Sequence, residues 1–256
     1  MTSTDPTRRD VDPTRLERSD VDRAKDAART QIWDALAREH AAQPNVHGKI
    51  PAFVGADVAA ARLAALPVWK HARIIKAVPD RAQLPVRGRA LAEGKIVYMA
   101  VPKLATEQPF RLLDPRHLTV PPDQAATHEV AMQVGQPIGV EEMYPVDLIV
   151  VGSVAVNRRG VRLGKGAGYA DLEVALLAEA GLLTDTTTIV TTMHPLQVLD
   201  QDLPETQHDF RVDLIVTPDE VITCTPPRQP AGLYWADLTA QKINAIPVLQ
   251  RLAAAR

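Results

Sequence analysis

The feature that most constrains the fold is a continuous apolar run, DLIVVGSVAV, at residues 147–156. A strand that is covered on both faces is apolar throughout, whereas a half-exposed strand alternates apolar and polar residues. The run is far shorter than the roughly 20 residues that a membrane-spanning helix needs. It therefore predicts a buried strand of a parallel sheet, and a glycine-rich segment and a helix follow it along the chain.

Shorter β-branched runs and periodic apolar segments predict the remaining elements. Further strands are expected at 72–78, 95–101, 110–113 (an edge strand), TIVTT from Thr188, 212–217 and 221–225, the last two as a hairpin. Helices are expected at 22–40, 55–66, 85–93, 127–133, 169–180 and, interrupted at Pro247, 236–254. This alternation predicts a three-layer, doubly wound α/β fold with a mostly parallel sheet and helices on both faces. We expect a flexible arm at 1–22 and a single domain at 23–256.

Composition excludes several classes of protein. The 29 basic and 31 acidic residues give a net charge of −2, which offers no reason to expect nucleic-acid binding. The single cysteine, Cys224, excludes an intrachain disulfide, and no signal peptide or membrane segment is recognised. We therefore expect a cytoplasmic protein with a small-molecule substrate, and the oligomeric state stays open.

Five of the 13 glycines lie between Gly152 and Gly168, directly before the expected helix. Glycines let backbone N–H groups approach an anion, and the N-terminus of a helix adds its positive dipole. The spacing matches neither a dinucleotide fingerprint nor a Walker A loop. Phosphate binding is favoured over a solvated turn, because four cations fall in the same segment: Arg158, Arg159, Arg162 and Lys165. Asp171, at the start of the helix, is a helix cap or a Mg²⁺ ligand beside the phosphates.

This loop resembles the signature of the 5-formyltetrahydrofolate cyclo-ligase family, G-x-R-L-G-x-G-x-G-Y-Y-D. Residues 160–171, GVRLGKGAGYAD, match its glycines, arginine, first tyrosine and aspartate. Lys25 and Arg29 resemble the family's K-x-x-x-R helix, and LPETQHD at 203–209 resembles its late P-x-x-x-H-D block. The stretch VHGKIPAFVGA at 46–56 is typical of a divergent branch, the methenyltetrahydrofolate synthetase domain-containing proteins.

The resemblance implies an ATP- and Mg²⁺-dependent ligase of one-carbon metabolism that converts 5-formyltetrahydrofolate to 5,10-methenyltetrahydrofolate. It implies that Arg162 and Lys165 are catalytic and that Asp171 supports Mg²⁺. The ATP-binding residues that it implies are Lys25, Arg29, Gly164, Lys165, Gly166, Ala167, Gly168, Tyr169 and Asp171. The family's folate-contacting glutamate and a nearby threonine correspond to Asp80 and Gln83, and the branch-typical loop adds His47 to the expected substrate site.

The departures from the family fall mainly on the folate side. Asp80, Gln83, Ala170 and Asn157 stand where the family has Glu, Thr, Tyr and Asp, so the phosphate half is the better match. Two alternatives therefore stay open. One is an ATP- or phosphate-binding enzyme of another cofactor pathway, such as thiamin-related salvage, and the other is a non-catalytic nucleotide-binding regulator.

Other polar residues are given mainly structural roles. No histidine or cysteine spacing fits a zinc site, so we expect His194 and His208 to be structural or surface residues. Arg87 and Arg89 flank Gly88 on a short expected helix. They either face solvent or contact an anion such as the glutamate tail of a folate.

Overall fold

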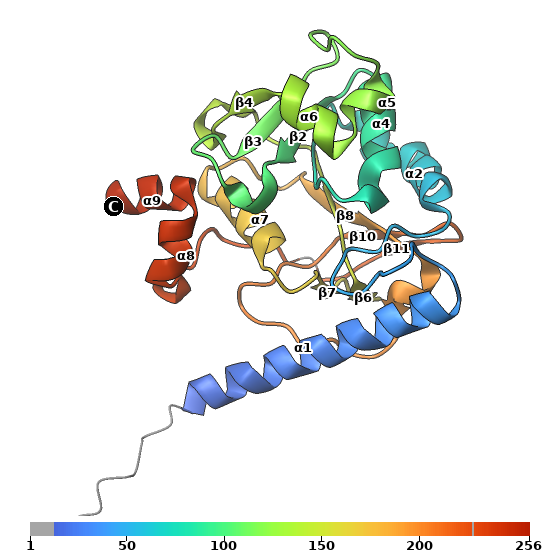
Figure 1. Cartoon of the computed structure of the whole chain (residues 1–256), viewed down its shortest axis with the longest axis vertical. Helices are drawn as coiled ribbons and strands as arrows, with labels where there is room; N and C mark the ends of the chain where they lie inside the picture. The colour runs from blue at the N-terminus through green and yellow to red at the C-terminus, as the bar shows by residue number, and fades with distance from the viewer. Residues whose placement is uncertain (1–12, 227) are drawn as a thin grey trace, which may run out of the picture.

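The computed structural model describes residues 13–226 and 228–256, and its centre is an eight-stranded sheet (Figure 1). The strand order is β11-β10-β8-β5-β1-β2-β3-β4. Five neighbouring strands are parallel: β10 (Leu214–Val216), β8 (Thr188–Thr192), β5 (Leu148–Val151), β1 (Ile74–Ala77) and β2 (Ile96–Ala100). The antiparallel strands are β11 (Val221–Thr223) at one edge, and β3 (Phe110–Leu113) followed by β4 (Gln136–Ile138) at the other.

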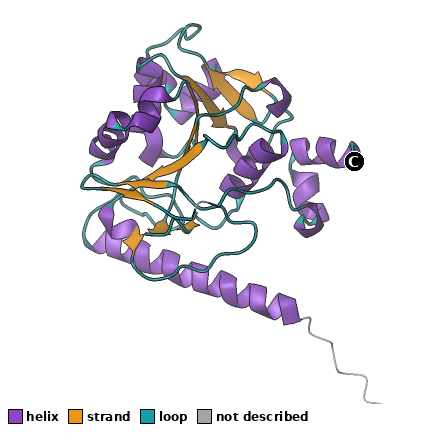
Figure 2. Ribbon diagram, turned by 180° about the vertical axis from the view of Figure 1, so that it is seen from behind, coloured by secondary structure: helices purple, strands orange, loops and turns teal. Residues whose placement is uncertain are grey.

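Helices cover both faces of this sheet, which confirms the predicted three-layer α/β fold (Figures 1 and 2). One face carries α2 (Ala56–Ala65), α3 (Pro67–His71), α4 (Leu84–Ala92), α5 (Pro122–Ala125) and α6 (His128–Val134). The other face carries α7 (Tyr169–Glu179), α8 (Ala240–Ala245) and α9 (Pro247–Ala254). Short 3₁₀ turns are η1 (Arg81–Gln83), η2 (Pro102–Leu104), η3 (Val140–Glu142), η4 (Pro195–Gln197) and η5 (Trp235–Asp237).

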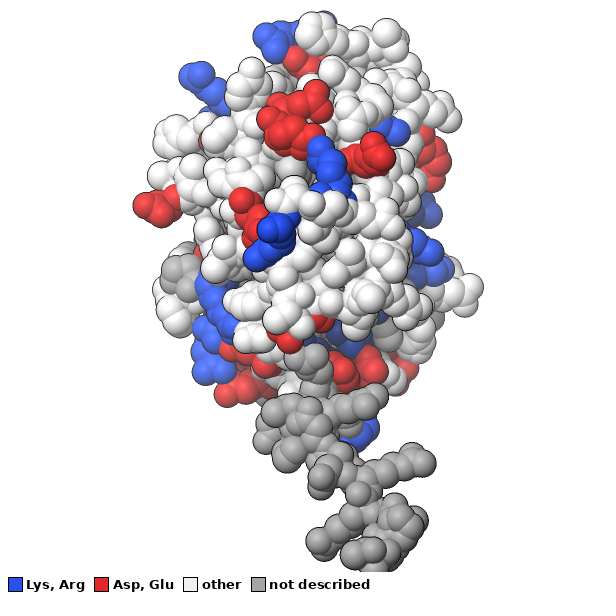
Figure 3. All heavy atoms as spheres, turned by 90° about the vertical axis from the view of Figure 1, so that its left-hand side faces the viewer, with Lys and Arg blue, Asp and Glu red and all other residues white. Residues whose placement is uncertain are grey.

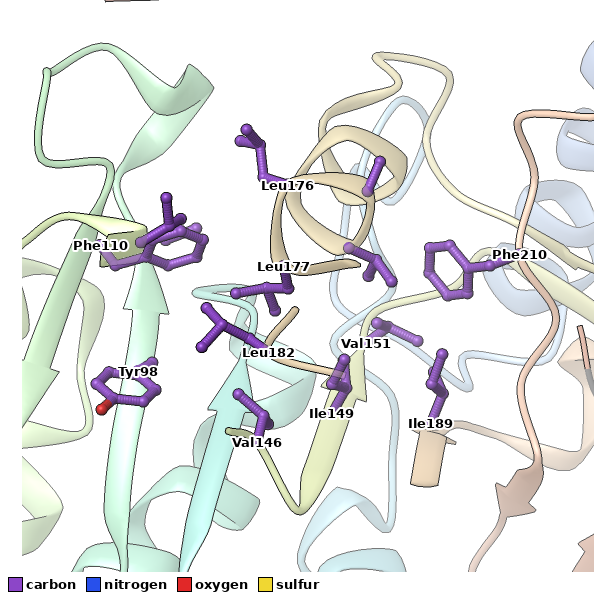
Figure 4. Packing of buried hydrophobic residues seen from close by; sticks show 14 of the residues in the cluster. Tyr98, Phe110, Val146, Ile149, Val151, Leu176, Leu177, Leu182, Ile189 and Phe210 are labelled. Atoms are coloured by element: carbon purple, nitrogen blue, oxygen red, sulfur yellow. The ribbon is translucent and has the colours of Figure 1, made fainter. Parts of the chain in front are cut away.

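The packing of strand β5 on both faces explains why apolar and polar residues do not alternate in its sequence. Leu148 and Val150 pack in the cluster under α2 to α6, whereas Ile149 and Val151 pack in the cluster under α7. Figure 4 shows this second face, where Leu177 of α7 points toward Leu182 and the strands of the sheet. Both sides of the strand are therefore dry, as a buried parallel strand requires.

Helix α1 (Pro13–Arg38) lies across one end of the molecule, beside a second, three-stranded sheet (Figure 1). The order of this sheet is β7-β6-β9, with bounds β7 (Arg162–Leu163), β6 (Ala155–Asn157) and β9 (Val198–Leu199). The apolar face of α1 packs against it through Ala28, Ile32 and Leu36. The helix begins at Pro13, so the last ten residues of the expected flexible arm are helical, and residues 1–12 lie outside the described part of the chain.

The predicted strand at 147–156 is wrong as a single element. The chain leaves the main sheet at Gly152, where a Cβ atom would come within 2.9 Å of the Ile50 side chain. The Ser153 hydroxyl hydrogen-bonds to the Thr191 hydroxyl at 3.0 Å, and β6 then begins in the small sheet. The glycine-rich segment consequently follows the β6–β7 hairpin rather than a strand of the main sheet.

Smaller differences lie at the periphery. The strand at 110–113 is not at the edge, because the unpredicted β4 lies outside it. Helices α3 and α5 were also not predicted, and α8 begins at Ala240 rather than near residue 236. In the described part of the chain, no helix combines the length and apolar character that a membrane span needs. Acidic and basic side chains are interspersed on the face in Figure 3.

The winding of the sheet locates its natural ligand crevice. The chain runs from β1 to β2 in one direction, and from β5 through β8 to β10 in the other. The reversal lies between β1 and β5, and open α/β sheets bind ligands beyond the carboxyl ends of the strands at such a switch point. Asp80 follows β1 and Gly152 follows β5.

Candidate functional site

A cavity of about 920 Å³ opens at this switch point. Its walls include Asp80 after β1, Val101 after β2 and Gly152 after β5. Helix α1, the glycine-rich loop (residues 164–168), the start of α7 and a late segment around residues 206–242 complete it. The volume is within the range of roughly 300–1,000 Å³ that is usual for small-molecule sites.

The glycine-rich loop forms one wall of the cavity. Gly166 has φ +97° and Gly168, which caps α7, has φ +69°, so both need the left-handed conformation that glycine adopts without strain. The backbone N–H groups of residues 165–168 donate to no other backbone group among the described residues. These N–H groups and the positive end of the α7 dipole are thus available to a phosphate.

Two cations of α1 lie one turn apart beside the loop. Arg29 donates from Nε to the carbonyl oxygen of Gly164 at 2.7 Å and from a terminal nitrogen to Asp26 at 2.5 Å. Lys25 donates from Nζ to Asp209 Oδ2 at 2.6 Å. Both side chains are about nine-tenths buried and line the cavity, as the K-x-x-x-R resemblance implies.

Arg162 and Asp171 form an ion pair under the start of α7. Arg162 is 3% exposed, and its guanidinium lies 4.0 Å from the centroid of the Phe210 ring. Burial raises the pKa of the Asp171 carboxyl, and the charge of Arg162 opposes this shift. Arg162 therefore holds a carboxylate in place beside the expected phosphate site.

Asp209 is a second carboxylate at this end of the cavity, and the sequence did not assign it a role. Burial alone raises the pKa of its carboxyl, but the hydrogen bonds from Lys25 and the Thr206 backbone N–H outweigh burial and lower the pKa. The neighbouring His208, expected to be structural, lines the cavity with its Nε2 3.2 Å from Asp237 Oδ2. The signal for these residues was the late P-x-x-x-H-D block, which carried a resemblance but no assigned chemistry.

The two carboxylates fit a Mg²⁺ ion that arrives with a nucleotide. Residues 13–226 and 228–256 contain no cluster of three or more His, Cys, Asp or Glu side chains able to hold a metal alone. Asp171 and Asp209 are close enough that the charge of Asp209 acts on the pKa of Asp171. Mg²⁺ commonly takes one or two carboxylates and completes its shell with phosphate oxygens.

The expected substrate residues divide into one inside the cavity and two outside its lining. Asp80 lines it, with Oδ1 3.7 Å from Lys165 Nζ. Gln83 is fully buried and donates from Nε2 to the backbone oxygen of Thr192 at 3.2 Å, so it does not line the cavity. His47 also lies outside the lining, where its Nε2 is 2.9 Å from Asp34 Oδ1. The His47 loop nevertheless contributes Lys49 and Ile50 to the wall.

The four cations of the glycine-rich segment do not lie together at the cavity, contrary to the sequence prediction. Arg162 and Lys165 line the cavity, whereas Arg158 and Arg159 lie on the β6–β7 hairpin outside it. These two arginines are half-exposed and form ion pairs with surface carboxylates: Asp200, Asp202 and Glu220. Asn157, which replaces the family's aspartate, shapes this hairpin by accepting the N–H groups of Arg159 and Val161 at 3.1 and 3.0 Å.

Arg87 has neither of the roles expected for it. It is 1% exposed and donates to the backbone oxygens of Val78 at 2.6 Å and Asp80 at 2.9 Å. Further hydrogen bonds reach the oxygens of Pro79 at 3.3 Å and Ala126 at 2.9 Å. The guanidinium therefore fixes the three-residue segment that leads from β1 into the cavity wall.

With this geometry in place, comparison with known proteins gives the family. The sequence profile of the 5-formyltetrahydrofolate cyclo-ligase family matches residues 21–218. The chain belongs to this family. Membership agrees with the resemblance of the glycine-rich loop.

Relatives and a solved structure of the family are similar to this chain. The methenyltetrahydrofolate synthase domain-containing proteins of Bos taurus and Homo sapiens are 38% identical over 237 residues and 35% identical over 238 residues. Each alignment covers 90% of this chain and 62% of the relative, so the chain spans under two thirds of the length of these proteins. The NMR structure of Aquifex aeolicus 5,10-methenyltetrahydrofolate synthetase has a similar fold. Its TM-score is 0.51 at 21% identity, over 80% of this chain and 95% of that chain.

Proposed function

We propose that the protein uses ATP to convert 5-formyltetrahydrofolate to 5,10-methenyltetrahydrofolate. The observation that carries the proposal is one cavity in which an anion-binding loop faces the crevice beyond β1 and β5. Membership of the cyclo-ligase family supports the same reaction. A site of this kind catalyses by positioning two substrates and by neutralising phosphate charge.

In the proposed reaction, the formyl oxygen of the folate attacks the γ-phosphorus of ATP, and ADP leaves. N10 of the folate then attacks the activated formyl carbon, and phosphate and the N10 proton leave as the ring closes. The N–H groups of the glycine-rich loop, with Arg29 and Lys165, would bind the phosphates. Asp171 and Asp209 would hold the Mg²⁺ ion, which neutralises the developing phosphate charge.

The contact between Lys165 and Asp80 supports an exchange of partners when ligands bind. The two charged atoms are 3.7 Å apart, and the Lys165 side chain is 47% exposed. A partly exposed ion pair of this kind contributes little to stability, about 0–1 kcal/mol. A phosphate therefore competes easily for the ammonium group, and Asp80 is released to a hydrogen-bond donor on the second substrate.

The experiment is a spectrophotometric assay of 5,10-methenyltetrahydrofolate formation with the purified chain, MgATP and 5-formyltetrahydrofolate. We expect product only when ATP is present, and a loss of about 10- to 100-fold in kcat/KM for ATP in Lys165→Ala, because a charged hydrogen bond is lost. Arg159→Ala is the matched control, since Arg159 is a half-exposed cation outside the cavity. ATP-independent product, or none, contradicts the proposal.

A second candidate is a nucleotide-dependent enzyme that acts on another cofactor precursor. The position of Gln83, fully buried and outside the cavity lining, favours it, because this residue stands where the family has a folate-side threonine. ATP binding without any competition or turnover from reduced folates, measured by isothermal titration calorimetry and by assay, supports this candidate over the first.

A further inference from the structure

A buried ion pair lies at the inner wall of the cavity and is not used by the reaction described above. Lys76, in β1, is completely buried and donates from Nζ to Glu173 Oε2 of α7. The Glu173 side chain is 8% exposed, and the residue lines the cavity. The neighbours of Lys76 along the strand, Ile75 and Ala77, are buried apolar residues.

Stability alone does not explain this pair. Removing both charges from water costs several kcal/mol for each ion, and apolar replacements of similar volume are often neutral or stabilising. Lys76 is in a central strand, paired with β2 on one side and β5 on the other. Apolar residues occupy the rest of this strand, so the charged pair points to a role in the cavity.

One oxygen of the Glu173 carboxylate remains available to a ligand. Lys76 binds Oε2, and Oε1 accepts no hydrogen bond from residues 13–226 and 228–256. The other wall residues nearby along α7 and at the end of β2 are mostly apolar: Ala100, Val101, Pro102, Leu172 and Ala175. This part of the cavity therefore combines apolar surface with one fixed hydrogen-bond acceptor.

The charge balance selects the kind of ligand that fits. The ammonium of Lys76 already compensates the carboxylate, so a cationic ligand would bring an uncompensated charge into a buried place. A neutral, flat heterocycle with N–H donors at its edge satisfies the free oxygen and covers the apolar wall. An aminopyrimidine edge, with its ring N–H beside an exocyclic amine, has this character.

We propose that Glu173 binds the N–H edge of the substrate's neutral nitrogen heterocycle, and that Lys76 is the positioning residue that holds its carboxylate. This inference deepens the proposed function and rests on it for the identity of the substrate. Asp80, the carboxylate that the family pattern places at the folate, lies beside Lys165 at the phosphate side. Glu173 would then supply the acceptor for the heterocycle, and Asp80 would lie nearer the reacting groups.

The test compares equilibrium binding of 5-formyltetrahydrofolate, pterin and MgATP to the wild-type chain and to two double variants. Lys76→Met with Glu173→Leu replaces the pair by apolar residues and avoids an unpaired buried charge. Lys76→Met with Glu173→Gln keeps a neutral acceptor at the same place. Thermal unfolding of each variant reports whether the fold is kept.

We expect the Met/Leu variant to keep wild-type affinity for MgATP and to lose about 10- to 100-fold in affinity for the folate and for pterin. The Met/Gln variant should recover part of that loss. Wild-type affinity for both heterocycles in the Met/Leu variant overturns the role of Glu173, even if wild-type turnover is normal. If the wild type binds the heterocycles but shows no turnover, the proposed reaction is contradicted. The comparison of heterocycle affinity between the wild type and the variants then still decides the role of Glu173. A wild-type chain that binds neither heterocycle overturns both.

Discussion

Replacing Arg87 by methionine should destabilise the fold and loosen one wall of the cavity. The substitution keeps the apolar stem of the side chain but removes the guanidinium group and with it every donor. Burial lowers the pKa of Arg87 to about 10, which corresponds to roughly 3 kcal/mol of unfavourable charge burial. Methionine removes this penalty, so the sign of the net effect depends on the backbone oxygens that the guanidinium binds.

Those oxygens outweigh the gain. The variant leaves the carbonyl groups of Val78, Pro79 and Ala126 without their guanidinium donor, whereas Asp80 O keeps the Gln83 N–H at 3.1 Å. An unsatisfied buried carbonyl costs about 1–3 kcal/mol, so the three together cost roughly 6 kcal/mol. The net loss is about 3 kcal/mol, which lowers the melting temperature by roughly 6–12 °C in a chain of this size.

The assay is thermal unfolding followed by circular dichroism, together with the KM for both substrates. Arg89→Met is the matched control, because Arg89 lies on the same helix and its side chain is 43% exposed. We expect the control to unfold within about 2 °C of the wild type, since surface substitutions usually change stability by under about 0.5 kcal/mol. An Arg87→Met melting temperature equal to that of the control would refute the reasoning that this guanidinium fixes the wall.

Three further predictions concern the glycine-rich loop, Lys25 of α1 and the loss of stability at acid pH. Gly166→Ala and Gly181→Ala both place a side chain at positive φ, +97° and +67°, but only the first should weaken MgATP binding in calorimetric titrations. Equal losses in the two variants would show that strain alone acts. Lys25→Met should lower MgATP affinity about tenfold by calorimetry, and unchanged affinity would exclude a phosphate contact. The hydrogen bond from Arg211 lowers the pKa of Glu205, so its stabilisation is present above the usual glutamate pKa of about 4.3 and is lost as pH falls through the folded value. Below about pH 4, the melting temperature of Glu205→Gln should therefore fall less steeply with decreasing pH than that of the wild type. Identical slopes in the two proteins would contradict this.

Local sequence signals predicted the layers of the fold but not the point where the chain changes sheets. Residues 152–154 are as buried as the strands on either side, so the run of buried positions continues past the end of β5. The break depends on Gly152 passing close to Ile50, a contact between segments about a hundred residues apart. Pro67 was ambiguous for a local reason. A proline is typical of the end of one helix, but it also suits the first turn of the next, which here is α3.

The glycine-rich loop that lines the cavity was easier to predict from the sequence than the surroundings of the buried charged residues, for a physical reason. Gly164, Gly166 and Gly168 shape the loop through their own backbone, so their spacing in the sequence is already the signal. Arg87 and Glu173 depend on which groups the fold brings to them, and a charged residue in a helix or strand reads as solvated until its partner is known. Arg158 and Arg159 show the reverse error, since both form ion pairs with surface carboxylates although nearby cations of the same segment line the cavity.

The most direct test of the central claim is a crystal structure with a non-hydrolysable ATP analogue, Mg²⁺ and 5-formyltetrahydrofolate bound together. We predict phosphate oxygens on the backbone N–H groups of residues 165–168, with the metal beside Asp171 and the folate beyond the ends of β1 and β5. Phosphates bound elsewhere on the chain, or a folate outside this cavity, would contradict it.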